Sequence, residues 1–324
     1  MTDVLAEAKH RLATGLDCEP PIFEPLIADQ WVIKSLLQKS IRRGEVDIAR
    51  RAALTFLAQE GSAIWRRFII IAFEEVGAGS VDDAAMTVAA STDASWRRQV
   101  GGDVIIVAHL ARLLAEAPKS RSAEHLITTA THHPSVEHER RLVSNRLIAD
   151  NLATVANESN TFTHRALAAW CVSGIGWKHE KLHGSDLPEL FDAYRKHGVP
   201  EELVAATGIA ATKSREPIIL MAPLIWLAAN DAQVPVIVEA AVPWSPALDD
   251  IPMYALDKHT RVGLESIRNL VKCNLRRTSL LLCRFSDAGM TRLSTHCGGR
   301  RPKSAKARNR GKWGTGGAAG AMEI

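Results

Sequence analysis

The segment HEKLH at residues 179–183 has the spacing H-E-x-x-H, which on a helix places two imidazoles on one face as zinc ligands. The chemistry that this pattern predicts is hydrolysis, with His179 and His183 on the metal and Glu180 as general base. Gly184 follows at once and leaves little helix to hold the ligands, and Glu189 stands where a third histidine is expected. We therefore favour a fortuitous match and keep a zinc-dependent hydrolase as an alternative.

Other cofactor signals are weaker. The five cysteines are widely spaced without a C-x-x-C pair, which argues against a disulfide framework and against a paired zinc site. His132 and His133 precede Pro134 and a helix start, so a solvated cap explains them. The pattern G-x-x-x-x-G-K-[ST] does not occur, and without its backbone amides and lysine there is no phosphate cradle for ATP. We expect no metal, no cofactor and no ATP hydrolysis.

Doubled arginines recur through the first half of the chain, and arginine suits phosphate because its planar fork makes bidentate contacts. Placed on one face, several pairs form a strip for a nucleic-acid backbone. The alternative is that each pair meets nearby acids such as Glu74/Glu75. Trp31, Trp65 and Trp96 stand among expected core positions, so base stacking is not indicated. The candidate contacts to nucleic acid or a partner are Lys39, Arg42, Arg43, Arg50, Arg66 and Arg67.

Charge divides the chain into two parts. From residue 275 onward there are eleven Lys/Arg and two acidic residues (net +9), whereas residues 1–274 hold 29 basic and 34 acidic residues (net −5). The Arg-, Gly- and Ser-rich composition of 275–324 predicts a basic, disordered tail that binds polyanions without specificity. No signal peptide or membrane-spanning run is visible, so the sequence predicts a soluble, cytoplasmic protein with no membrane partner.

The elements that position these residues are predicted to be helices. After an extended, proline-containing lead-in at 1–28, an apolar period marks a helix from Asp29 that ends at Gly44. Further helices are predicted at 46–57, 63–76, 80–90, 95–117, 122–131 and 136–156. Short loops join them, which is typical of a mainly α helical bundle or collar over 29–157.

Residues 158–274 are predicted to form a second, smaller helical region. The expected helices are 163–171, 187–197, 201–212, 217–229 and 258–272, with one strand candidate at Val236–Val242. Pro243–Pro252 is expected to be a loop.

Three segments resemble the C-terminal domain of replication-associated recombination ATPases of the MgsA/RarA type, relatives of the AAA+ clamp loaders. They are KSLLQKSIRRG at 34–44 with EVDIAR at 45–50, the pair Arg66-Arg67 with IAFEEVG at 71–77, and APKS at 117–120. They cover about 29–130 in the family's order. The family's ATPase module, which precedes this domain, does not correspond to anything in residues 1–28.

The resemblance implies a clamp-loader-collar-like helical domain that joins copies of itself, near proteins of DNA replication or repair. We therefore expect a non-catalytic oligomerisation or scaffold protein with DNA or replication and repair proteins as partners. The alternatives are the zinc hydrolase and a nucleic-acid-binding protein that uses the arginine pairs and the basic tail.

Overall fold

A computed structural model of the chain describes residues 5–16, 19, 21–175, 185–229 and 242–273. By the density of internal contacts the chain divides into two compact units, residues 1–268 and 269–324. The first unit includes the predicted region 29–157 and all but the last six residues (269–274) of the predicted region 158–274. The predicted tail, the zinc motif and all of the strand candidate except Val242 lie outside the described residues.

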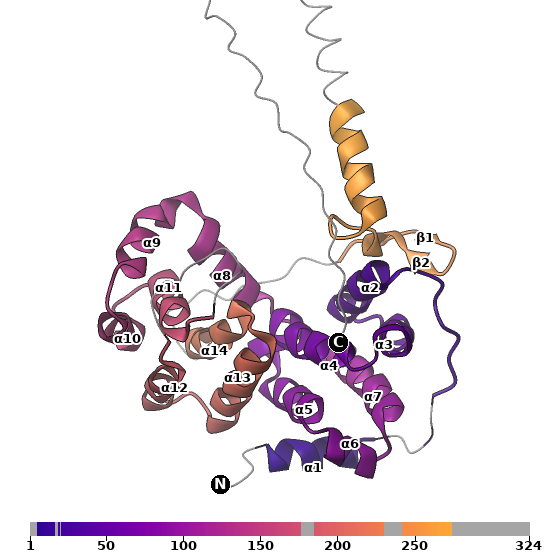
Figure 1. The fold of residues 1–324 in the computed structure, drawn as a ribbon, viewed down its shortest axis with the longest axis horizontal. Helices are drawn as coiled ribbons and strands as arrows, with labels where there is room; N and C mark the ends of the chain where they lie inside the picture. Colours follow the sequence, from indigo (N-terminus) through magenta and orange to yellow (C-terminus); the bar gives the residue numbers. More distant parts are fainter. Residues whose placement is uncertain (1–4, 17–18, 20, 176–184, 230–241, 274–324) are drawn as a thin grey trace, which may run out of the picture. The chain divides into compact units, whose positions relative to one another are not determined.

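The described part of the chain is mainly α, which confirms the predicted fold class (Figure 1). The α-helices are α1 (Ala6–Thr14), α2 (Gln30–Arg43), α3 (Val46–Glu60), α4 (Ala63–Ile71), α5 (Val81–Thr92), α6 (Ala94–Gln99), α7 (Asp103–Glu116), α8 (Ser122–His132), α9 (Glu137–Ser144), α10 (Ile148–Ala156), α11 (Phe162–Ser173), α12 (Leu187–Lys196), α13 (Glu201–Ser214), α14 (Ala222–Ala229) and a last helix at 261–273.

Short elements complete the chain path. Four are 3-10 turns and one is a π-helical turn. The five turns and the two strands are η1 (Ala72–Val76, π-helical), η2 (Gly77–Gly79), η3 (Pro134–Val136), η4 (Pro217–Met221), η5 (Met253–Ala255), β1 (Ala247–Leu248) and β2 (Ile251–Pro252). The two strands pair antiparallel within the segment that was expected to be a loop.

The ends of α2 follow from its sequence. Asp29 caps the helix, because its carboxylate accepts hydrogen bonds from the backbone N–H groups of Trp31 (2.8 Å) and Val32 (3.1 Å). Gly44 ends it in the left-handed conformation, with φ of 73°, which glycine adopts without strain. The predicted boundaries of this helix are confirmed.

The first core lies where α2, α3 and α7 pack together. Leu36, Leu37, Phe56 and Leu110 are completely buried there. The helical period of the sequence places these apolar residues on one face of each helix, so burying that face stabilises all three together. Helix α1 packs on α5.

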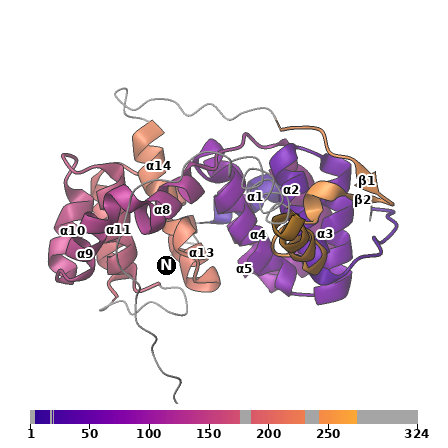
Figure 2. The same ribbon diagram turned by 90° about the horizontal axis from the view of Figure 1, so that it is seen from above.

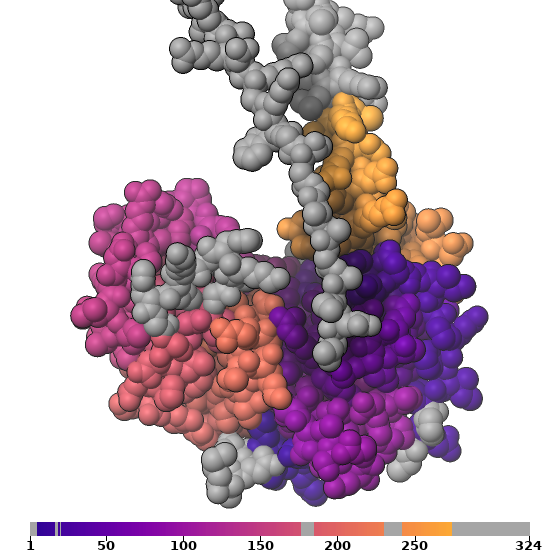
Figure 3. All heavy atoms as spheres, in the orientation of Figure 1, coloured from indigo at the N-terminus to yellow at the C-terminus, as the bar shows by residue number. Residues whose placement is uncertain are grey.

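The later helices form a second group around α11, which packs against α8, α10 and α12. In Figure 2 this group lies beside α2–α5, and α13 packs against both α4 and α5 at the junction. The space-filling view shows continuous contact between α13 and the earlier helices (Figure 3). The hydroxyl of buried Tyr194 donates to the carbonyl of Leu220 at 3.1 Å and ties α12 to η4.

Several predicted elements were wrong in detail. The expected helix 95–117 is two helices, since Gly101 and Gly102 have φ of 128° and 85° and interrupt it. The expected helix 136–156 also divides, because Leu147 adopts an extended conformation as the N-cap of α10. Helix α1 lies inside the lead-in that was predicted to be extended. No helix in the described ranges is long and apolar enough to span a bilayer.

Gly79 lies against the loop that follows α7. A Cβ at Gly79 would stand 2.7 Å from the carbonyl oxygen of Pro118, and a backbone atom cannot turn aside. We expect Gly79→Ala to lower the free energy of unfolding by about 1–3 kcal/mol, measured by urea denaturation.

Gly208→Ala is the matched control. Its Cβ would meet the ring of Phe191 at 3.2 Å, a side chain that can rotate, and alanine gains about 1 kcal/mol of helix propensity inside α13. We expect a smaller change than at Gly79. Equal losses at both positions would contradict the backbone clash.

Candidate functional site: a basic cavity beside a buried carboxylate

The carboxylate of Glu75 is completely buried and lies at the centre of an ionic cluster. Arg42 of α2 binds it with both arms of its guanidinium, Nε to Oε2 at 2.7 Å and Nη2 to Oε1 at 2.5 Å. The amide of Gln38 donates to Oε1 at 2.6 Å, and Nε of Arg121 lies 3.6 Å from Oε2. A buried carboxylate is stable only when it is paired and hydrogen-bonded in this way.

A π-helical turn places Glu75. Helix α4 does not end at Ile71 but widens into η1, which carries Glu74 and Glu75. The backbone carbonyl of Glu75 also accepts a hydrogen bond from the N–H of Ser120 at 2.9 Å. That bond fixes the loop between α7 and α8 and brings Arg121 beside the cluster.

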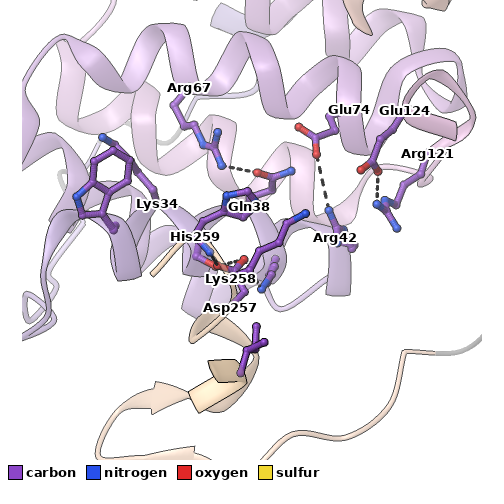
Figure 4. Close-up of a pocket in the computed structure, with 14 residues that line it drawn as sticks. Lys34, Gln38, Arg42, Arg67, Glu74, Arg121, Glu124, Asp257, Lys258 and His259 are labelled. Atoms are coloured by element: carbon purple, nitrogen blue, oxygen red, sulfur yellow. Dashed lines mark hydrogen bonds and ion pairs between the residues drawn. The ribbon is translucent and has the colours of Figure 1, made fainter. Parts of the chain in front are cut away.

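Next to this cluster is a cavity of about 730 Å³. Its lining comes from α2, from the end of α4 and η1, from the start of α8 and from residues 257–267. Figure 4 shows Gln38 and Arg67 joined on one side, with Lys258 and His259 nearby. The lining residues are Trp31, Lys34, Ser35, Gln38, Lys39, Arg42, Arg67, Glu74, Arg121, Glu124, Asp257, Lys258, His259 and Ile267.

Cations outnumber carboxylates in this lining. Lys39 pairs with Asp257 at 2.7 Å and donates to the carbonyl of Tyr254 at 2.6 Å. Arg121 pairs with Glu124. Asp257 is further held by the hydroxyl of Ser35 at 3.1 Å. Burial acts to raise the pKa of Asp257, but its hydrogen bonds to Lys39, to the backbone of His259 and to Ser35 outweigh burial and lower that pKa.

Glu74 behaves differently from its neighbour Glu75. It faces the cavity, and Nη2 of Arg42 lies 3.9 Å from it (Figure 4). Burial, followed by the negative charges of Glu75 and Glu124, raises the pKa of Glu74 to about 7. The charge of the cavity therefore changes near neutral pH.

Three of the predicted contact residues come together in this cavity, namely Lys39, Arg42 and Arg67. The other three lie elsewhere. Arg43 pairs with Glu45 at 2.6 Å and Arg66 with Glu216 at 2.8 Å, while Arg50 lines a separate small pocket. Arg42, Arg43 and Arg66 each meet a nearby acid, as the alternative of neutralisation expects.

Some residues that line the cavity were not predicted from the sequence. Trp31 was expected in the core, but 55% of it is exposed, and it borders the cavity. Asp257 and Lys258 lie more than 200 residues along the chain from the α2 residues that they face in the cavity, which no local spacing indicates. For the ionic cluster, the sequence offered one indication: the neighbouring acids Glu74 and Glu75 were expected to neutralise arginines.

The structure does not test the prediction of a zinc-dependent hydrolase, because His179, Glu180 and His183 lie outside the described residues. Within the described ranges, no group of three or more His, Cys, Asp and Glu residues is arranged to hold a metal ion. Comparisons with protein-family models, with curated proteins and with solved structures found no match to this chain.

Glu75→Gln tests the cluster. The substitution leaves the half-buried guanidinium of Arg42 without its main counter-charge, and breaking a buried pair costs about 3–5 kcal/mol. We expect a loss of unfolding free energy of that size in urea denaturation at pH 7. Glu74→Gln, one residue away, is the control and should change stability far less. A loss at Glu75 below that at Glu74 would contradict the central role of Glu75.

The pKa of Glu74 predicts a dependence of stability on pH. Because the folded pKa of about 7 lies above the ordinary glutamate pKa of 4.5, the folded state holds the proton more tightly. The unfolding free energy contributed by this group therefore falls as pH rises from about 4.5 to 7. Between pH 5 and pH 8 we expect wild type to lose about 2 kcal/mol more than Glu74→Gln. Parallel stability profiles for the two proteins would show that Glu74 has an ordinary pKa.

Proposed function

We propose that this chain is a non-catalytic, cytoplasmic helical protein that assembles with copies of itself and has an accessory role in DNA replication or repair. The observation that carries the self-association is an apolar stripe on the last helix. The role in replication or repair rests on the resemblance to the clamp-loader-related family.

The helix at 261–273 has an apolar face that no residue of the described ranges buries. Leu264, Ile267, Leu270 and Val271 follow the helical spacing and lie on one side, and each is more than a third exposed. The charged residues occupy the other side. A helix of this length is marginal in water without a packing partner, so burial of the stripe is the natural source of its stability.

The stripe is complementary to itself. When two copies of the helix run antiparallel about Ile267, Leu264 of one copy meets Leu270 of the other, as a two-fold interface requires. In this register no charged side chain of the helix directly opposes another charged one. The charged residues are Arg261, Glu265, Arg268 and Lys272.

The segments that carry the family resemblance also meet in space. Glu75 of the second segment is bound from both others: Arg42 of the first segment binds its carboxylate, and the N–H of Ser120 in the third donates to its backbone carbonyl. This convergence supports the view that residues 29–130 form the helical domain that the resemblance implies. It is why we extend the proposal to replication or repair.

Leu264→Glu tests self-association. The substitution places a charge in the stripe at both symmetric ends of the pair, and burying an unpaired charge is strongly unfavourable. We expect sedimentation equilibrium to show wild type as an oligomer and Leu264→Glu as a monomer, or at least a tenfold weaker association.

The matched control is Val262→Glu. Val262 lies on the same helix and is 51% exposed, but it faces away from the stripe, so association should be retained. Leu264 is preferred to Ile267 because Ile267 also lines the cavity. A wild-type chain that stays monomeric at high concentration would overturn the proposal.

The role in replication or repair is tested in cells. Loss of a replication accessory should raise sensitivity to agents that stall replication forks, and wild type but not Leu264→Glu should restore resistance. Unchanged resistance in cells without the protein would remove this half of the proposal and leave the association intact.

A further inference from the structure

Three cations of the cavity have no carboxylate partner in the described part of the chain. These are Lys34, Arg67 and Lys258, none of which has a carboxylate oxygen within 4.0 Å there. The remaining cations are already paired, Lys39 with Asp257, and Arg42 and Arg121 with the glutamates. The remaining acid of the lining, Glu74, lies 3.9 Å from Arg42 and does not balance three positive charges. The cavity thus carries an excess of positive charge.

Of these three cations, Arg67 has a buried donor that lacks an acceptor within the described ranges. Its Nη2 donates to the Oε1 of Gln38, but its buried Nε has no hydrogen-bond partner among the described residues. Burial also lowers the pKa of Arg67. A buried donor that lacks an acceptor is costly, and an anion in the cavity would supply the acceptor and the counter-charge together.

The size of the cavity limits the ligand. About 730 Å³ lies within the range of small-molecule sites, which hold ligands such as cofactors and nucleotides. Trp31 offers an exposed indole at the cavity, and the Nζ of Lys34 lies 4.5 Å from its ring centroid. An aromatic ring next to cations suits a ligand that combines a planar group with negative charge.

We propose that this cavity binds a phosphorylated small molecule of nucleotide size, with the phosphate held by Arg67, Lys34 and Lys258 and the planar group against Trp31. Three unpaired cations match a phosphate that carries more than one charge better than a single carboxylate. The fork of the arginine and the point charges of the lysines are the groups that bind phosphate oxygens. This goes beyond self-association, which depends on the stripe of the last helix and shares only Ile267 with the cavity.

Isothermal titration calorimetry on the full chain at pH 8 tests the proposal, with ATP, pyrophosphate, inorganic phosphate, adenosine and a single-stranded oligothymidylate as probes. We expect one ATP per chain, weaker binding of pyrophosphate and phosphate, and none of adenosine. Arg67→Gln and Lys258→Gln should each weaken ATP binding at least tenfold. Glu74→Gln should strengthen it, because a negative charge leaves the cavity.

Arg66→Gln is the matched control. It is the neighbouring residue on α4, but it pairs with Glu216 outside the cavity and should bind ATP as wild type does. Circular dichroism checks that each variant folds, and Lys258→Gln and the gain at Glu74→Gln keep the test valid if Arg67→Gln unfolds.

Four results overturn the proposal. These are no binding of any phosphate compound at about 1 mM, equal binding of adenosine and ATP, equal losses at Arg66 and Arg67, and binding of the oligonucleotide without the mononucleotide. The last result assigns the cations to a nucleic-acid strand instead. None of these results bears on the sedimentation of Leu264→Glu, so this proposal and the proposed self-association fail separately.

Discussion

The pairing of Arg42 with Glu75 is the constraint on which the rest of this region depends. A completely buried carboxylate is tolerated only if every lone pair finds a donor, and Arg42 and Gln38 of one helix supply most of them. Because the donors lie on α2 and the acceptor on η1, the pair fixes the distance and rotation between these elements. Apolar packing between α2, α3 and α7 stabilises the core but does not specify that register so narrowly.

The cavity is a consequence of this constraint. With Arg42 turned toward the buried carboxylate, the side chains one turn earlier on α2, Gln38 and Lys39, border open space. Gln38 is held from both sides, since its amide donates to Glu75 and its oxygen accepts from Arg67. That arrangement orients Arg67 inward without neutralising it. Glu75, the fully buried acid of the cluster, is already bound by Arg42 and Gln38. It therefore cannot neutralise Arg67, and the pocket keeps a positive charge.

Much of this could be predicted from sequence and some could not. The period of α2 and its cap at Asp29 were enough to locate the helix, because both are local properties. The division of 95–117 at Gly101–Gly102 was missed, since the apolar period continued across it. The place of Lys258 and Asp257 in the cavity depends on tertiary contacts that no spacing encodes. Trp31 was assigned to the core because large aromatic residues usually lie there, yet it borders the cavity.

The adjacent residues of like charge show why such pairs do not reliably predict a charged binding surface. Adjacent residues on a helix point about 100° apart, so a pair can rarely serve one face. Arg67 and Glu74 face the cavity, whereas their neighbours Arg66 and Glu75 turn outward to Glu216 and inward to Arg42, respectively. In the pairs Arg66/Arg67 and Glu74/Glu75, one residue therefore lines the cavity and the other forms an ion pair with another part of the chain. A search for a basic strip counts both members, and in doing so it overstates the surface charge and overlooks the enclosed cavity.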